Sequence, residues 1–151
     1  MNPALCPARP HVKVCCISSH DEADAALAAG AHALGLVSAM PSGPGVIDEA
    51  LIAAIAAQVA LQRPDVQTFL LTSQTSAAAI VAQHQRCRTT TLQLVDHVPP
   101  PELARLRTAL PGVRLVQVVH VTSEASLAEA MAAAPLVDAI LLDSGNPAAA
   151  V

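Results

Sequence analysis

A chain of 151 residues is long enough to form one domain with a sizeable hydrophobic core. Hydrophobic residues make up 53% of it and charged residues 13%, and Phe69 is its one aromatic residue. The formal net charge is −4 and no basic stripe with interleaved aromatic residues occurs, which argues against a nucleic-acid partner. No apolar run reaches the roughly 18 residues that a membrane span needs, so no membrane partner is expected.

The four cysteines, at positions 6, 15, 16 and 87, lack the spacing of a disulfide framework. This usage indicates a reducing, cytoplasmic protein. Residues 1–10 contain several prolines and no apolar core, so they read as a loose lead-in rather than a secretory signal. Residues 11–151 are then expected to form a single domain.

Strands and helices are predicted to alternate along the whole chain, beginning with the strand-like run HVKVCCISS at 11–19. Further strands are expected at 32–37, 66–71, 89–95, 113–121 and 137–142. Helices are expected at 21–29, 48–61, 76–85, 102–110 and 123–133. Gly30 suits the end of the first helix, Asp48 the start of the second, and Thr75 or Ser76 the cap of the third.

Strict alternation with short connections predicts an α/β fold with a parallel sheet and right-handed crossovers. Two architectures compete, the closed barrel of eight β/α units and the open doubly wound sheet. The open sheet usually carries a glycine-rich turn after its first strand, and here that turn contains no glycine. The sequence therefore favours a TIM-barrel type (β/α)8 fold, incomplete, with about six of the eight units.

Active groups in such a barrel sit at the carboxyl ends of the strands. Cys15 lies near the end of the first strand, on the same face as Lys13, and a nearby cation favours the thiolate form of cysteine. Asp143 closes the sixth, apolar strand, where partial desolvation favours a protonated carboxyl group. A thiolate and a carboxylic acid could move protons across a small substrate. The alternatives are a cysteine packed as a small hydrophobe and an aspartate that caps the next segment.

Four runs of the sequence, VKVCCISS, DEADAALAAGAHALGLV, TLQLV and VDAILLDSGN, together resemble phosphoribosylanthranilate isomerase, a barrel enzyme of tryptophan biosynthesis. They occur in the family's order over residues 12–146. The resemblance implies an Amadori rearrangement of N-(5-phosphoribosyl)anthranilate to its ribulose isomer, a phosphosugar reaction without cofactor or metal. It implies that Cys15 is the general base that takes the C2′ proton, that Asp143 is the general acid that opens the furanose, and that Gln93 lines the pocket.

The sequence also departs from this family. Cys16 stands where the family has glycine, Val95 where it has histidine, and the loop at 42–45 lacks the family's arginine for the anthranilate carboxylate. The seventh and eighth units, whose loops hold the substrate phosphate in the family, are not in this sequence. The chain alone is therefore expected to be a poor enzyme, completed by a homodimer or a complementing C-terminal segment. The alternative is a non-catalytic or truncated relative that binds a partner or small ligand.

A metal cluster of His11, Cys15, Cys16 and His20 is disfavoured, because neighbouring strand residues point to opposite faces. His120 is expected at the rim or in the core.

Overall fold

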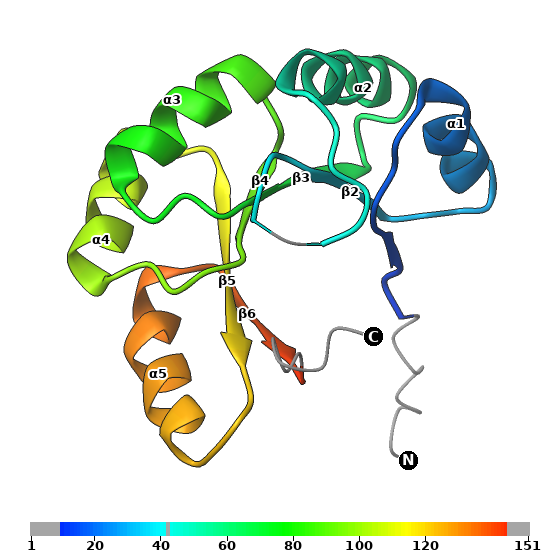
Figure 1. Cartoon of the computed structure of the whole chain (residues 1–151). Helices are drawn as coiled ribbons and strands as arrows, with labels where there is room; N and C mark the ends of the chain where they lie inside the picture. Colours follow the sequence, from blue (N-terminus) through cyan, green and yellow to red (C-terminus); the bar gives the residue numbers. More distant parts are fainter. Residues whose placement is uncertain (1–9, 42, 145–151) are drawn as a thin grey trace, which may run out of the picture.

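A computed structural model describes residues 10–41 and 43–144 of the chain. Six parallel strands form one sheet in the order β1-β2-β3-β4-β5-β6, so each strand pairs with the next one in the sequence (Figure 1). The strands are β1 (Lys13–Val14), β2 (Ala33–Val37), β3 (Gln67–Thr72), β4 (Thr91–Leu94), β5 (Arg114–His120) and β6 (Ala139–Asp143). The helices are α1 (His20–Ala28), α2 (Glu49–Gln62), α3 (Ala77–Cys87), α4 (Pro100–Ala109) and α5 (Ala125–Ala133), and a short 3-10 turn, Ala134–Leu136, follows α5.

The sheet curls, and the five helices cover its convex outer side (Figure 1). A doubly wound sheet would reverse its strand order and carry helices on both faces. The sequential order and the single helical layer therefore confirm the prediction of an incomplete barrel with six of its eight β/α units.

The hydrophobic core lies between the sheet and the helices. Leu34, Leu70 and Leu92 from the strands are fully buried, as are Ile55 and Ile80 from the helices. Each such side chain contributes about 1.5–3 kcal/mol when it leaves water. This layer fixes the positions of the strand ends, where the candidate site lies.

Polar residues start the first three helices, as the sequence predicts for the second and third. The side chains of Ser19, Asp48 and Ser76 accept hydrogen bonds from backbone N–H groups in the first turns of α1, α2 and α3. Of the two residues predicted to cap α3, Ser76 is the one that does so. The Glu102 carboxylate on α4 also accepts from Ala77 N at 2.7 Å, which ties α4 to the start of α3.

The first strand is shorter than predicted. The sequence predicted a strand that continues to Ile17, before the Ser-Ser-His-Asp run, whereas β1 ends at Val14. Cys16 has a φ of 60°, in the left-handed region, and this conformation interrupts the extended chain. Ile17 N still donates to Gly35 O at 3.2 Å, so the segment after β1 stays attached to β2.

Strands β1 and β6 form the two edges of the described sheet, because each pairs with only one described strand. Leu142 on β6 is 66% exposed, and Leu127 and Met131 on α5 are exposed to a similar degree.

Of the expected lead-in, residues 1–9 lie outside the described residues. Within the described part of the chain, none of the helices has the length and apolar character needed to cross a bilayer.

Candidate active site

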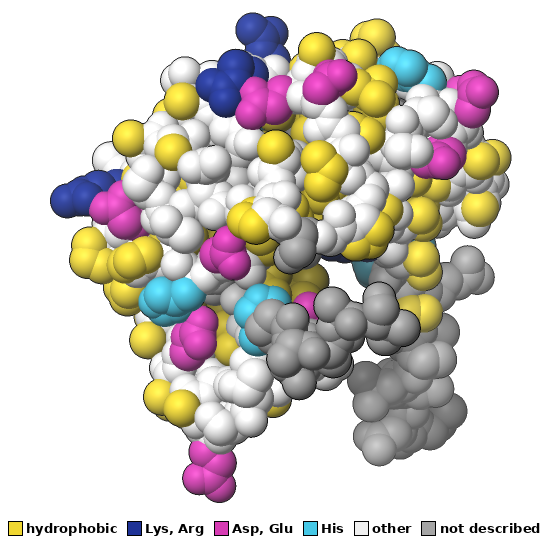
Figure 2. Space-filling model, viewed as in Figure 1, with side chains coloured by type: hydrophobic (Ala, Val, Ile, Leu, Met, Phe, Trp, Pro, Cys, Tyr) yellow, Lys and Arg dark blue, Asp and Glu magenta, His cyan; other side chains and the backbone are white. Residues whose placement is uncertain are grey.

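The carboxyl ends of the six parallel strands meet at one rim of the curled sheet. Cys15 follows β1, Gln93 lies on β4, and His120 and Asp143 end β5 and β6. Gln93 pairs in register with Val116, and His120 pairs with Asp143. Because strand residues alternate between faces, Gln93, His120 and Asp143 all belong to the concave face. Figure 2 shows a hollow on this side, with histidine and acidic side chains along its border.

Lys13 and Gln93 meet across the concave face. The Lys13 ammonium group donates a hydrogen bond to Gln93 Oε1, and it also lies 4.7 Å from the centroid of the Phe69 ring on β3. Gln93 is 6% exposed, so this polar contact is buried on its β4 side. The sequence predicted that Gln93 lines the pocket, but it did not predict the hydrogen bond from Lys13 to Gln93.

Cys15 is exposed and lies directly against Gly35 on β2. A β-carbon added to Gly35 would stand 2.8 Å from Cys15 Sγ, so only glycine leaves room for the thiol in this position. The structure directs the Lys13 ammonium group toward β3 and β4. An effect of Lys13 on the ionisation of Cys15 therefore stays a prediction.

Cys16 packs against the loop after β2, whereas Cys15 packs against Gly35 on β2. A β-carbon added to Gly45 would come within 2.5 Å of the Cys16 β-carbon, so the loop after β2 packs tightly on Cys16. The φ of 60° at Cys16 is a conformation that glycine adopts most easily. This is a physical reason for the glycine at this position in the family that the sequence resembles.

Asp143 faces His120 on the neighbouring strand. His120 Nδ1 lies 3.8 Å from Asp143 Oδ2, and both side chains are about half exposed, at 44% and 49%. The sequence predicted a more desolvated carboxylate. The greater exposure follows from the position of β6, which is an edge strand of the described sheet.

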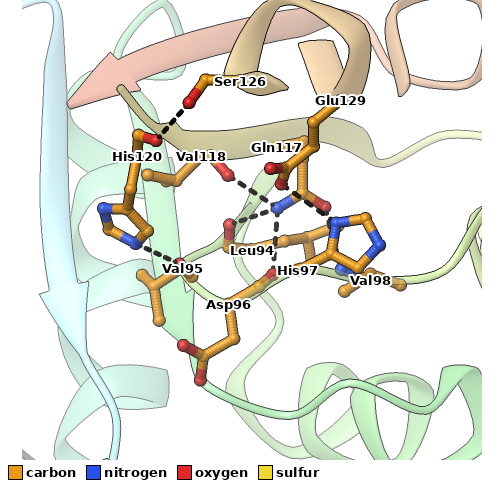
Figure 3. A network of polar contacts seen from close by, with 10 residues as sticks. All are labelled: Leu94, Val95, Asp96, His97, Val98, Gln117, Val118, His120, Ser126 and Glu129. Atoms are coloured by element: carbon orange, nitrogen blue, oxygen red, sulfur yellow. Dashed lines mark hydrogen bonds and ion pairs between the residues drawn. The ribbon is translucent and has the colours of Figure 1, made fainter. Parts of the chain in front are cut away.

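The segment that follows β4 is fixed by Gln117, a buried amide on β5 (Figure 3). Gln117 Nε2 donates to Leu94 O and Asp96 O, and Gln117 Oε1 accepts from Val98 N at 3.3 Å. His97 in the same segment pairs with Glu129 on α5 at 3.0 Å. The sequence analysis missed Gln117, although an amide within the apolar run VRLVQVVHV could have marked it.

The structure separates the residues of the disfavoured metal cluster. His11 packs on the His32 ring at 4.7 Å, whereas His20 Nδ1 interacts with Gln58 on α2. In residues 10–41 and 43–144, no group of three or more His, Cys, Asp or Glu side chains could hold a metal ion.

One cavity, of about 490 Å³, lies beside β1 and α1. It is mostly apolar, with Cys15 and Cys16 at one side and Ala25 and Ala29 of α1 at the other. Gln93 and Asp143 do not line it. The described residues therefore bring the three predicted site residues to one rim of the sheet, and of these three only Cys15 lines this cavity.

Known proteins provide an independent comparison. No family model matches the chain. The N-(5′-phosphoribosyl)anthranilate isomerase of Afipia carboxidovorans is 33% identical over 136 residues, which are 90% of this chain and 56% of the relative. The isomerase of Thermosynechococcus vestitus is 30% identical over 93% of this chain and 60% of its own length. That of Methanocella arvoryzae is 27% identical over 89% of this chain and 62% of its own.

The chain is a homologue of the phosphoribosylanthranilate isomerases. Its fold agrees with theirs. The crystal structure from Thermus thermophilus superposes with a TM-score of 0.76 at 23% identity, over 93% of this chain and 65% of that one. The structure from Thermotoga maritima gives a TM-score of 0.73 at 21% identity, over 88% and 60%. This homologue spans about 60% of the length of the curated relatives it matches.

Proposed function

We propose that this homologue carries the acid–base residues of a phosphoribosylanthranilate isomerase, acting in the cytoplasm on N-(5-phosphoribosyl)anthranilate in tryptophan biosynthesis. The observation that supports this most strongly is the 27–33% identity to such isomerases over about 90% of the chain. Cys15 after β1 and Asp143 at the end of β6 are the rim groups to which we assign proton transfer.

The proposed reaction begins with two proton transfers, one from Asp143 and one to Cys15. Asp143 gives a proton to the furanose ring oxygen, the bond between this oxygen and C1′ breaks, and the nitrogen lone pair forms a C1′=N double bond. The Cys15 thiolate then removes the C2′ proton, and the electron pair of that bond moves to give an enolamine. Protonation at C1′ and loss of the C2′ hydroxyl proton yield the ketone. General acid and base groups typically contribute about 10²–10⁴-fold each to such steps.

Gln93 has a supporting role in this proposal. Its amide oxygen holds the Lys13 ammonium group on the concave face, close to the Phe69 ring. The pair would line the pocket and present a fixed positive charge to an anionic substrate. No metal or cofactor enters the proposed chemistry.

Closure of the site requires a partner in this proposal. A related isomerase has been crystallised in complex with reduced 1-(o-carboxyphenylamino)-1-deoxyribulose 5-phosphate, and the Thermotoga maritima isomerase is described as dimeric. For this chain we propose that either a C-terminal segment with two further β/α units or a second copy pairs with the edges at β1 and β6. The exposed Leu127, Met131 and Leu142 would be covered by such a partner.

A second candidate function is a non-catalytic relative that keeps the half-barrel and binds a partner or small ligand. The sequence of the loop at 42–45, which has no arginine, favours it.

Steady-state turnover separates the two candidates. We would assay the chain, and the chain extended past Val151 by the last two β/α units of the Afipia carboxidovorans relative, on N-(5-phosphoribosyl)anthranilate. Cys15→Ala should abolish turnover, whereas the matched Cys16→Ala change should leave most of it. If the extended chain folds but shows no turnover, the second candidate is the better one.

A further inference from the structure

We propose that Cys15 and Cys16 form a two-thiol site that chelates one trivalent arsenic atom carrying an apolar group, and that the cavity beside β1 and α1 receives this group. The inference does not rest on the proposed isomerase activity. Cys16 stands where the family that the sequence resembles has glycine, so the resemblance does not supply this site.

The backbone at Cys16 changes the direction of its side chain relative to that of Cys15. In an extended strand, neighbouring side chains point to opposite faces. The φ of Cys16 is 60°, which differs by about 180° from the value of about −120° in a parallel strand, and this rotation ends the alternation after Cys15. Both cysteines line the same cavity, of about 490 Å³.

Two close contacts hold the cysteine side chains in place. A β-carbon added to Gly35 would lie 2.8 Å from Cys15 Sγ, and one added to Gly45 would lie 3.0 Å from Cys16 Sγ. Cys16 Sγ also donates a weak hydrogen bond to Pro44 O, at 3.7 Å. Both side chains therefore pack against β2 or the loop after it, and chelation costs little additional side-chain freedom. Cys15 is exposed and Cys16 is partly exposed, so a small reagent can reach them.

The spacing of adjacent residues favours a bridging atom over a direct disulfide between Cys15 and Cys16. Consecutive α-carbons are about 3.8 Å apart across a trans peptide bond, whereas a disulfide usually joins α-carbons that are about 4.4–6.8 Å apart. An arsenic atom between the two sulfur atoms lengthens the link and relieves this strain. The two thiols therefore stay available to a thiophilic atom.

The walls of the cavity select the kind of thiophilic ligand. They are mainly apolar and include Val14, Ile17 and Ala25. Among the described residues that line the cavity, Glu22 alone is charged, and its carboxylate already accepts from Ser18 N at 2.7 Å and from Ser18 Oγ at 2.9 Å. Thiolates prefer soft partners, and an apolar group bonded to arsenic suits an apolar wall better than a hydrated metal ion does.

Chelation of phenylarsine oxide balances without an oxidant or a reductant. Each thiol gives up its proton, two sulfur–arsenic bonds form, and the oxide oxygen leaves as water with both protons. Arsenic stays trivalent and keeps its phenyl group. Because the second sulfur–arsenic bond forms within one molecule, it should tighten binding by about 10²-fold or more over that of a single thiol.

Titration of the reduced chain with phenylarsine oxide tests the two-thiol site without any need for activity. We expect one arsenic atom to bind per chain with the loss of two free thiols, and ethanedithiol to reverse the binding. Cys15→Ser and Cys16→Ser should each weaken binding by at least about a hundredfold. Cys6→Ser is the matched control and should bind as the wild type does. Wild-type affinity in Cys16→Ser, or an equal loss in Cys6→Ser, would overturn the inference.

Filling the cavity tests where the apolar group lies. Ala25 and Ala28 are both exposed residues of α1, but only Ala25 lines the cavity, so Ala28→Leu is the matched control for Ala25→Leu. Leucine is a good helix former, so both variants should fold. We expect Ala25→Leu to weaken phenylarsine oxide binding by about tenfold and to leave the binding of inorganic arsenite, which has no phenyl group, unchanged. Equal effects of the two leucine variants, or of Ala25→Leu on the two arsenic compounds, would refute the placement of the phenyl group.

Discussion

Lys13 on β1 donates a hydrogen bond to Gln93 on β4, although β2 and β3 lie between these strands in the sheet. In a flat sheet the first and fourth strands would be about 14 Å apart, since neighbouring strands are separated by about 4.8 Å. The contact therefore depends on the curl of the sheet, and it ties the first β/α unit to the fourth.

Gln93→Met should destabilise the fold, because it leaves the Lys13 ammonium group without its acceptor on a half-buried surface. We expect the free energy of unfolding to fall by about 1–2 kcal/mol in urea titrations. Gln67→Met is the matched control. Gln67 lies on the same concave face, and its side chain makes no hydrogen bond to another described residue. An equal loss for both variants would contradict a specific role for the contact.

Gly35→Ala should displace the Cys15 thiol. The new β-carbon would stand 2.8 Å from Cys15 Sγ and 3.2 Å from its α-carbon, so the segment after β1 must move. We expect a loss of about 1–3 kcal/mol in the free energy of unfolding, together with a changed alkylation rate at Cys15. Gly112→Ala, which has open space around its added carbon, should change neither quantity. Wild-type stability and alkylation in Gly35→Ala would refute the close approach.

Cys87 should be chemically inert in the folded protein. Burial against the core, together with the nearby Glu49 carboxylate, raises the pKa of its thiol to about 11. Only the thiolate reacts readily, so iodoacetamide at pH 8 should modify Cys87 at least about a hundredfold more slowly than exposed Cys15. Peptide mass spectrometry over time gives both rates. Comparable alkylation rates for Cys87 and Cys15 in the native protein would contradict the buried position of Cys87.

Asp138 should make the fold sensitive to acid. Burial opposes its ionisation, but hydrogen bonds from Leu115 N at 2.7 Å and from the Arg107 guanidinium at 3.0 Å outweigh this and lower the pKa of Asp138. A lowered folded-state pKa stabilises the protein above the unfolded-state value, about 3.9, and this stabilisation is lost as the pH falls toward the folded-state value. Urea unfolding at pH 7 and pH 3 should show a smaller pH dependence for Asp138→Asn than for the wild type. Asp48→Asn, which keeps a capping side chain on α2, is the comparison variant.

Much of the fold follows from local sequence patterns. The predicted helices agree with α1 to α5 to within about two residues at most ends, because Ser19, Asp48, Ser76 and Gly30 mark them by capping and by backbone conformation. The preference for a barrel depended on a missing glycine-rich turn, and the strand order confirms it. The predicted length of the first strand was wrong, because the alternation of apolar residues does not reveal the left-handed conformation of Cys16.

The candidate site was less predictable. Sequence position brings Cys15, Gln93 and Asp143 to strand ends, but the contacts that fix them come from the curl and register of the sheet. The Lys13–Gln93 bond joins residues 80 positions apart, and His120 faces Asp143 only because β5 and β6 pair with that register. Neither contact leaves a periodic signal in the sequence.

We propose that Cys15 removes the C2′ proton of N-(5-phosphoribosyl)anthranilate while Asp143 supplies a proton. The most direct test is turnover of the extended chain in D₂O, with the product analysed by mass spectrometry and NMR. We expect a ribulose product with about one deuterium at C1′, formed at a rate that Cys15→Ala and Asp143→Asn each reduce by roughly 10²-fold or more. A folded extended chain that yields no such product, or one in which Cys15→Ala retains the full rate, would contradict it.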